Sequence, residues 1–197
     1  MSQILQSLYK TLLAGVVLLV LVLFITSSVT GQSIQFGHAW GSFVMRWLHV
    51  ICGVMWIGLL WYFNFVQIPS MPSIPDEQKP AISKVIAPTA LFWFRYAALA
   101  TVITGLLLAW MQNYIVPALT LQLPFAAIGI GMWIALVMAF NVWFIIWPNQ
   151  KKALGMVVVE PAEKAKAART AMLTSRINTL LSITMLYMMV AQQNGGL

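Results

Sequence analysis

The run LLAGVVLLVLVLFI, residues 12–25, contains no polar side chain. A helix needs about 20 mostly apolar residues to cross the hydrocarbon core of a membrane. The run reaches that length over about residues 11–28, so we predict a transmembrane helix there. Lys10 before the run and the sequence SSVTG after it also fit a cleaved secretory signal peptide, which is the alternative interpretation.

The composition of the chain agrees with a membrane protein. Hydrophobic residues make up 61% of the 197 residues and charged residues only 8%, whereas a soluble domain carries roughly 25% charge. The net charge of +7 is scattered between apolar runs, which argues against nucleic-acid binding. The single cysteine, Cys52, excludes an intrachain disulfide, and two histidines are too few for a typical protein zinc site.

Four further apolar stretches predict four more spans. We therefore expect an all-α polytopic bundle of about five transmembrane helices that forms a single membrane domain, residues 1–197. Pro148 should end the fourth span, because proline removes a helix donor. The later spans are expected at residues 41–66, 91–111, 123–147 and 171–192.

The cations of the connections predict the direction of each span. The two connections after the first and third spans contain no Lys or Arg, whereas the other two and the amino-terminal tail do. Positive loops face the cytoplasm, so we expect a cytoplasmic amino terminus, a periplasmic carboxyl terminus and a multi-pass protein of the bacterial inner membrane. The cations of these segments are Lys10, Lys79, Lys84, Lys151, Lys152, Lys164, Lys166 and Arg169.

Aromatic residues and local motifs add three expectations. Aromatic side chains near the span ends indicate an interfacial belt. The prolines of IPSMPSIP, residues 68–75, predict an extended segment. The sequence EPAE, residues 160–163, is typical of a helix start, because proline suits the first turn and acids complement the helix dipole. The belt residues are Trp40, Tyr62, Trp93, Trp110, Tyr114 and Trp147.

The second span carries polar residues at helical spacing. Steps of three or four residues place them along one face of a helix. Arg46 lies about 8 Å and His49 about 12 Å below the outer end, at a rise of 1.5 Å per residue. An ionisable residue at such depth usually faces the bundle interior and marks function. The residues of this face are Arg46, His49, Gly53, Trp56, Leu60 and Asn64.

His49 is our candidate ligand of the iron of a b-type haem, because neutral imidazole binds iron well. Gly53, one turn later, would let a flat macrocycle approach the backbone. All four acids fall in predicted cytoplasmic connections, so Arg46 would bind a haem propionate or substrate anion, bond carbonyls or extend to the surface. The alternative for His49 is a hydrogen bond to a neighbouring helix. His38 could reach the same iron only if the glycine-rich link folded back or a second protomer supplied it, and the alternative is an interfacial loop histidine.

Other polar residues lie within or beside the predicted spans. Asn64, Asn141, Arg176 and Asn178 are candidates to contact a substrate or support the haem ligand. The asparagines could equally form hydrogen bonds between helices. Arg95 and Arg176 lie near cytoplasmic ends, where long side chains can extend to the surface.

Three ordered motifs resemble the membrane domain of bacterial urate hydroxylase. They are RWLHVICGVMWIG with YFNFVQ (residues 46–58 and 62–67), NVWFIIWPNQ (141–150) and SRINTLLS (175–182). The resemblance covers about residues 41–190. It implies an oxidoreductase of purine catabolism that oxidises urate and passes electrons to a cytochrome c. The sequence has no Cys-x-x-Cys-His motif, so a separate periplasmic cytochrome c would accept the electrons.

The resulting functional hypothesis is a membrane redox protein with haem b on His49. The alternative is a non-catalytic membrane subunit of a larger respiratory or transport complex. A third hypothesis is a carrier whose Arg46 binds an anion. The expected partners are the lipid bilayer, a cytochrome c and further copies of the chain.

Overall fold

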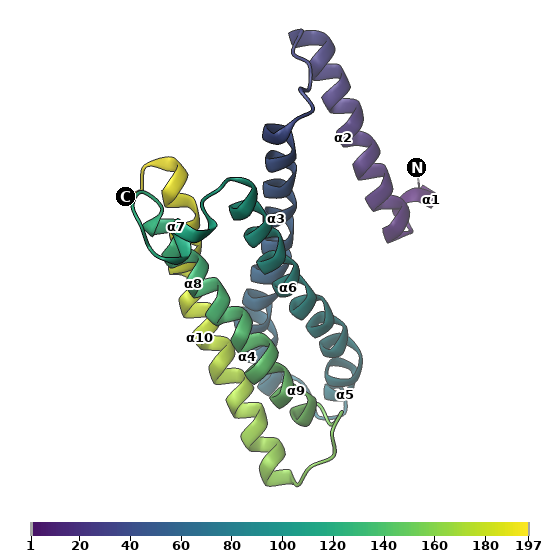
Figure 1. Ribbon diagram of the computed structural model, residues 1–197. Coiled ribbons are helices and arrows are strands. Elements are labelled where there is room, and N and C mark those ends of the chain that lie inside the picture. The colour runs from purple at the N-terminus through teal and green to yellow at the C-terminus, as the bar shows by residue number, and fades with distance from the viewer. Residues whose placement is uncertain (1, 197) are drawn as a thin grey trace. The chain divides into compact units, whose positions relative to one another are not determined.

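The computed structural model describes residues 2–196 and contains only helices and connections in that part of the chain. The chain forms two compact units, Met1–Gly41 and Ser42–Leu197. The all-helical fold class is therefore confirmed. Figure 1 shows the order of the helices along the chain.

The first unit contains the most apolar helix. The short helix α1 (Ser2–Leu5) precedes α2 (Leu8–Thr30), which Gly31 ends in a left-handed conformation with φ of 68°. The run at residues 12–25 lies inside α2, and α2 buries none of its side chains. Such a helix exposes its whole apolar surface, as lipid contact requires.

The second unit is built from four long helical stretches. Each contains an α-helix, and three are continued or preceded by short π-helical turns. The first stretch comprises α3 (His38–Trp61, whose first four residues belong to the first unit), η1 (Tyr62–Gln67), α4 (Ile68–Ser70) and η2 (Met71–Ser73). The second stretch comprises α5 (Lys79–Ala81), η3 (Ile82–Ile86) and α6 (Ala87–Met111). The third comprises α8 (Ala126–Phe140), η4 (Asn141–Ile146) and α9 (Trp147–Ala153), and the short α7 (Ile115–Leu119) precedes it. The fourth stretch is α10 (Pro161–Asn194).

Four helical stretches are long and apolar enough to cross a membrane. They are Leu8–Thr30, His38–Ser73, Lys79–Met111 and Ala126–Ala153. The lengths and composition of these helices are compatible with a multi-pass membrane protein. The fifth predicted span, residues 171–192, lies within α10, which is not among the four, so its membrane crossing and the direction of the chain remain predictions.

Two expectations based on proline were wrong. Residues 68–73 are helical rather than extended, and the helix that holds Pro148 continues to Ala153. In both places proline occupies the first turn after a π-helical segment. The fixed φ of proline suits a first helical turn, and its missing N–H costs little there. The helix start at residues 160–163 is confirmed, because α10 begins at Pro161 after an extended Glu160.

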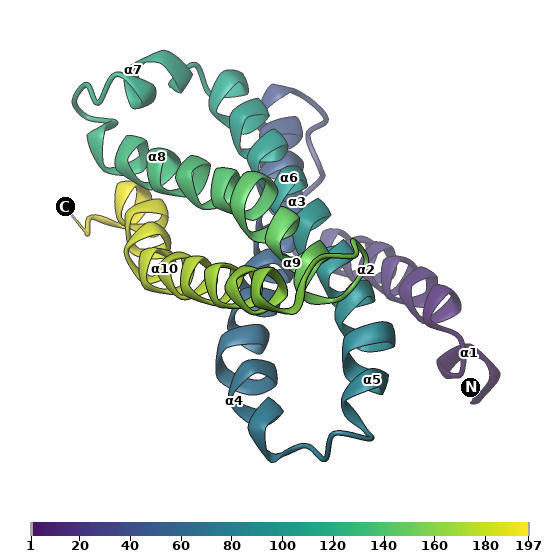
Figure 2. The ribbon, with the colours of Figure 1, turned by 90° about the horizontal axis from the view of Figure 1, so that it is seen from below.

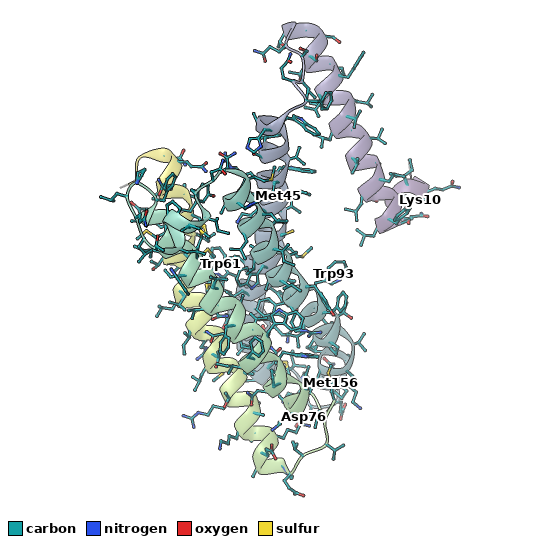
Figure 3. All side chains as sticks on the ribbon, viewed as in Figure 1. Lys10, Met45, Trp61, Asp76, Trp93 and Met156 are labelled. Atoms are coloured by element: carbon teal, nitrogen blue, oxygen red, sulfur yellow. The ribbon has the colours of Figure 1, made fainter. Side chains whose placement is uncertain are left out.

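Neighbouring stretches of the second unit pack antiparallel around a common core. Figures 1 and 2 show α8 and α10 side by side. Figure 3 shows the two ends of the second unit. Met45 lies at one end, and Asp76 and Met156 lie at the other. The latter is called here the lysine-bearing end, because the helical segments that end there carry Lys79, Lys84, Lys151 and Lys152. The main core cluster includes Trp56, Leu60, Phe63, Phe94, Met138, Val142 and Ile146.

Candidate functional site

A large cavity of the second unit lies between α3, α6, α8 and α10. Its volume is about 610 Å³, within the range of about 300–1,000 Å³ that is typical of small-molecule sites. Its walls are mostly apolar and include three methionines. We call it the outer cavity, because Arg46 and His49 in its wall lie towards the end of the second unit opposite the lysine-bearing end. Its few polar side chains are Arg46, His49, Thr101, Tyr114, Gln193 and Asn194.

His49 reaches the cavity wall from α3 and is held by α6. Its Nδ1 lies 2.9 Å from the carbonyl oxygen of Thr101 and 3.2 Å from Oγ1 of Thr104. A carbonyl oxygen can only accept, so Nδ1 carries the proton and donates. In the neutral ring Nε2 then holds a lone pair, and it has no hydrogen-bond partner among residues 2–196. Histidines that bind metals are oriented in this way.

Two glycines make room around this imidazole. A Cβ placed on Gly105 would lie 2.8 Å from Cε1 of His49, so the ring packs directly against the α6 backbone. A Cβ on Gly53 would have only one neighbour, Thr101 Cγ2 at 3.9 Å. The wall at Gly53 is therefore open space on the cavity side, as a flat ligand would need.

Arg46 and Tyr114 form the polar part of the same wall. The buried Nε of Arg46 has no hydrogen-bond partner in the part of the chain that the structure describes. Tyr114, which we had assigned to the aromatic belt, is instead buried and stacked on Phe125 with ring centroids 5.4 Å apart. Burial raises the pKa of the Tyr114 phenol, and the charge of Arg46 opposes that rise. An anionic group in the cavity would find an uncompensated cation there.

The three asparagine candidates lie between helices, outside the cavity lining. Asn141 donates to Oδ1 of Asn178 at 2.8 Å, and Asn178 donates to the Met138 carbonyl at 2.9 Å. Asn64 donates to Oγ of Ser175 at 2.8 Å. This geometry matches the alternative of hydrogen bonds between helices.

The two arginines assigned to cytoplasmic ends behave differently. Arg176 is exposed on α10 and does not line the outer cavity. Arg95 is only 8% exposed, so the expectation that it extends to the surface was wrong. Its guanidinium lies 3.4 Å from the centroid of the Trp147 ring, and such a cation–π contact stabilises a buried cation.

Cys52 does not line the outer cavity, and His38 belongs to the first unit. His38 is exposed and forms the first residue of α3. Cys52 is half-buried and free. Within residues 2–196 no three His, Cys, Asp or Glu side chains gather as a metal site.

No protein-family model, no curated protein and no solved structure matches this chain.

Proposed function

We propose that this chain is an integral membrane haem protein in which Nε2 of His49 binds the iron of haem b. The observation that carries the proposal is the hydrogen bond from Nδ1 of His49 to the Thr101 carbonyl. It leaves Nε2 as the free basic nitrogen of a side chain that lines a cavity of about 610 Å³.

The residues around His49 fit such a group. The walls are apolar, as a macrocycle requires, and Gly53 has room on the cavity side. The unpartnered Arg46 guanidinium supplies a cation for a propionate. A paired arginine and carboxylate form a charge-assisted hydrogen bond, which is stronger than a neutral one. Haem, when bound, supplies one-electron redox chemistry. This chain orients the His49 imidazole, and its apolar cavity walls exclude water.

The reaction we propose is the two-electron oxidation of urate, in which water supplies the added oxygen, two protons are released, and two molecules of a separate periplasmic cytochrome c each accept one electron. It rests on the three motifs that resemble the urate hydroxylase membrane domain. His49, Arg46 and Gly53 of the first motif all line the cavity. With five spans and a cytoplasmic amino terminus in the bacterial inner membrane, the cavity end with Arg46 would lie towards the periplasm.

The absorption spectrum of the purified protein tests haem binding. Wild-type protein expressed with ample haem should show a Soret band, and His49→Ala should lose it. His38→Ala is the matched control, because it removes the other histidine, which is exposed. A colourless wild-type protein, or a Soret band that survives in His49→Ala, would overturn the assignment.

Anaerobic addition of urate tests the reaction separately. We expect urate to reduce the oxidised haem protein, and cytochrome c to reoxidise it. If the haem band is present but urate leaves it oxidised, the haem assignment stands and the substrate is wrong. If His49→Ala leaves the activity of a larger complex intact, the chain is a structural subunit.

A further inference from the structure

A second, smaller cavity lies at the lysine-bearing end of the second unit. Its volume is about 290 Å³, and it is lined from η1, α4, η2, η3, α6, α9 and α10. None of its lining residues lines the outer cavity. Its polar side chains are Gln67, Ser83, Gln150 and Ser175. It is called here the inner cavity.

The inner cavity contains hydrogen-bonding groups that the protein itself does not satisfy. Oε1 of Gln67 and Oε1 of Gln150 are both buried and have no partner among the described residues. Oδ1 of Asn64, whose Nδ2 donates to the cavity residue Ser175, is also buried and unpartnered. A buried oxygen without a donor costs roughly 1–3 kcal/mol, so three of them in one region need an explanation.

Water explains these groups better than an empty or apolar space does. A buried water typically makes two to four hydrogen bonds to polar groups that would otherwise be unsatisfied. A cavity of about 290 Å³ has room for several waters, since each occupies about 30 Å³ in the liquid. The amide oxygens are uncharged acceptors, which water can satisfy without a counter-ion.

The position of the cavity gives this water a way out. Its lining includes Met71, Ile82 and Leu154. Met71 and Ile82 are close in sequence to the connection at residues 74–78, and Leu154 is the first residue of the connection at residues 154–160. Both connections belong to the lysine-bearing end. The same lining includes Phe63 and Ser175, which lie deeper in the helices.

We propose that the inner cavity is a hydrated vestibule, in which water bonds the amide oxygens of Gln67 and Gln150 and exchanges with the aqueous phase at the lysine-bearing end. It is an aqueous site separate from the outer cavity. Its occupancy does not depend on haem.

Thiol accessibility tests the vestibule in the full-length protein in membrane vesicles. In a Cys52→Ser background, Ser175→Cys places a thiol of similar size on the cavity wall. Ile177→Cys is the matched control, because Ile177 lies two residues later on α10 and is 53% exposed on the outer surface of the helix. The reagent is the membrane-impermeant 2-sulfonatoethyl methanethiosulfonate, and the extent of modification is measured by mass spectrometry.

The thiolate is the reactive form and requires water around it. We therefore expect Ser175→Cys to react at least about tenfold faster than Ile177→Cys, when the reagent is on the lysine-bearing side. Equal rates, or reaction only from the opposite side, would overturn the proposal.

A stability measurement provides a second test that needs no labelled variant. If the cavity were dry, replacing its unpaired amides by Gln67→Leu and Gln150→Leu would remove a desolvation cost and raise the melting temperature. In a hydrated vestibule the same changes remove hydrogen bonds to water, so the melting temperature should stay or fall. A higher melting temperature of the double variant would contradict the proposal.

Discussion

Gly105→Ala should separate haem binding from folding. A Cβ at this position would lie 2.8 Å from Cε1 and 3.2 Å from Nδ1 of His49, and ordinary contacts begin at 3.4 Å. To go from 2.8 to 3.4 Å, the ring must retreat by 0.6 Å from α6. Because Thr101 is on the same helix one turn earlier, the ring also moves away from its carbonyl acceptor.

The consequence can be estimated from the hydrogen bond. The distance from Nδ1 to the Thr101 oxygen is 2.9 Å, and a retreat of 0.6 Å lengthens it to as much as 3.5 Å. This exceeds the upper limit of about 3.2 Å for a good N–H···O bond. Loss of a hydrogen bond that orients a metal-binding histidine typically costs about 10–100-fold in affinity, and we expect a loss of that size for haem.

The assay is a haem titration followed by absorbance, with thermal unfolding measured in parallel. Gly58→Ala is the control, because it adds the same methyl group to the wall of the same cavity with no atom within 4 Å. Gly105→Ala should unfold near the wild-type temperature, since the His49 ring can move. If folded Gly105→Ala binds haem as tightly as wild type, the proposed role of the Thr101 hydrogen bond is wrong.

Three further predictions concern stability and charge. Gly129→Ala places a Cβ 2.0 Å from the backbone oxygen of Ala118, and such overpacking should lower the unfolding free energy by about 1–3 kcal/mol, measured by denaturant titration. Asn178→Ala removes both hydrogen bonds of a fully buried amide, and should cost about 0.6–1.7 kcal/mol for each bond, in the same assay. The exposed Asp76 accepts a hydrogen bond from Lys79, and this bond lowers its pKa. The stability that this pair contributes should be lost as pH falls through the lowered pKa of Asp76. Lys79→Met should return the pKa of Asp76 to its ordinary value, as measured by NMR titration. An unchanged pKa would refute the pairing.

Hydrophobic patterning located the long helices because each must present apolar residues over a long stretch. The apolar run at residues 12–25 lies within α2, where a helix was predicted. Proline was a poorer guide. Pro148 occupies a position where its missing donor matters little. Each of the three π-helical turns within residues 2–196 is followed two residues later by a proline, namely Pro69, Pro88 or Pro148, and interpreting proline as a helix end overlooked this pattern.

The site was predictable only on one of its walls. Spacing along α3 brought Arg46, His49 and Gly53 together, because helical periodicity is local. Thr101, which orients His49, is 52 residues away in sequence. Its contribution is a backbone carbonyl, which any residue type would offer. Tyr114 was assigned to the aromatic belt, because a tyrosine near a helix end gives the same pattern whether it faces lipid or a cavity.

The burial of Arg95 was not predicted from the sequence either. Arg95 was expected to extend to the surface, because it lies near a predicted cytoplasmic end of a span. Its partner is the ring of Trp147, which sequence spacing could not identify across two helices.

The absorption spectrum of His49→Gly, recorded with and without added imidazole, tests the central claim most directly. Removing the side chain leaves space for free imidazole in the same wall. We expect no Soret band without imidazole and a band restored with it, while the outer cavity and the fold stay intact. A His49→Gly protein that keeps the wild-type haem spectrum without imidazole would contradict the assignment of His49 as the iron ligand.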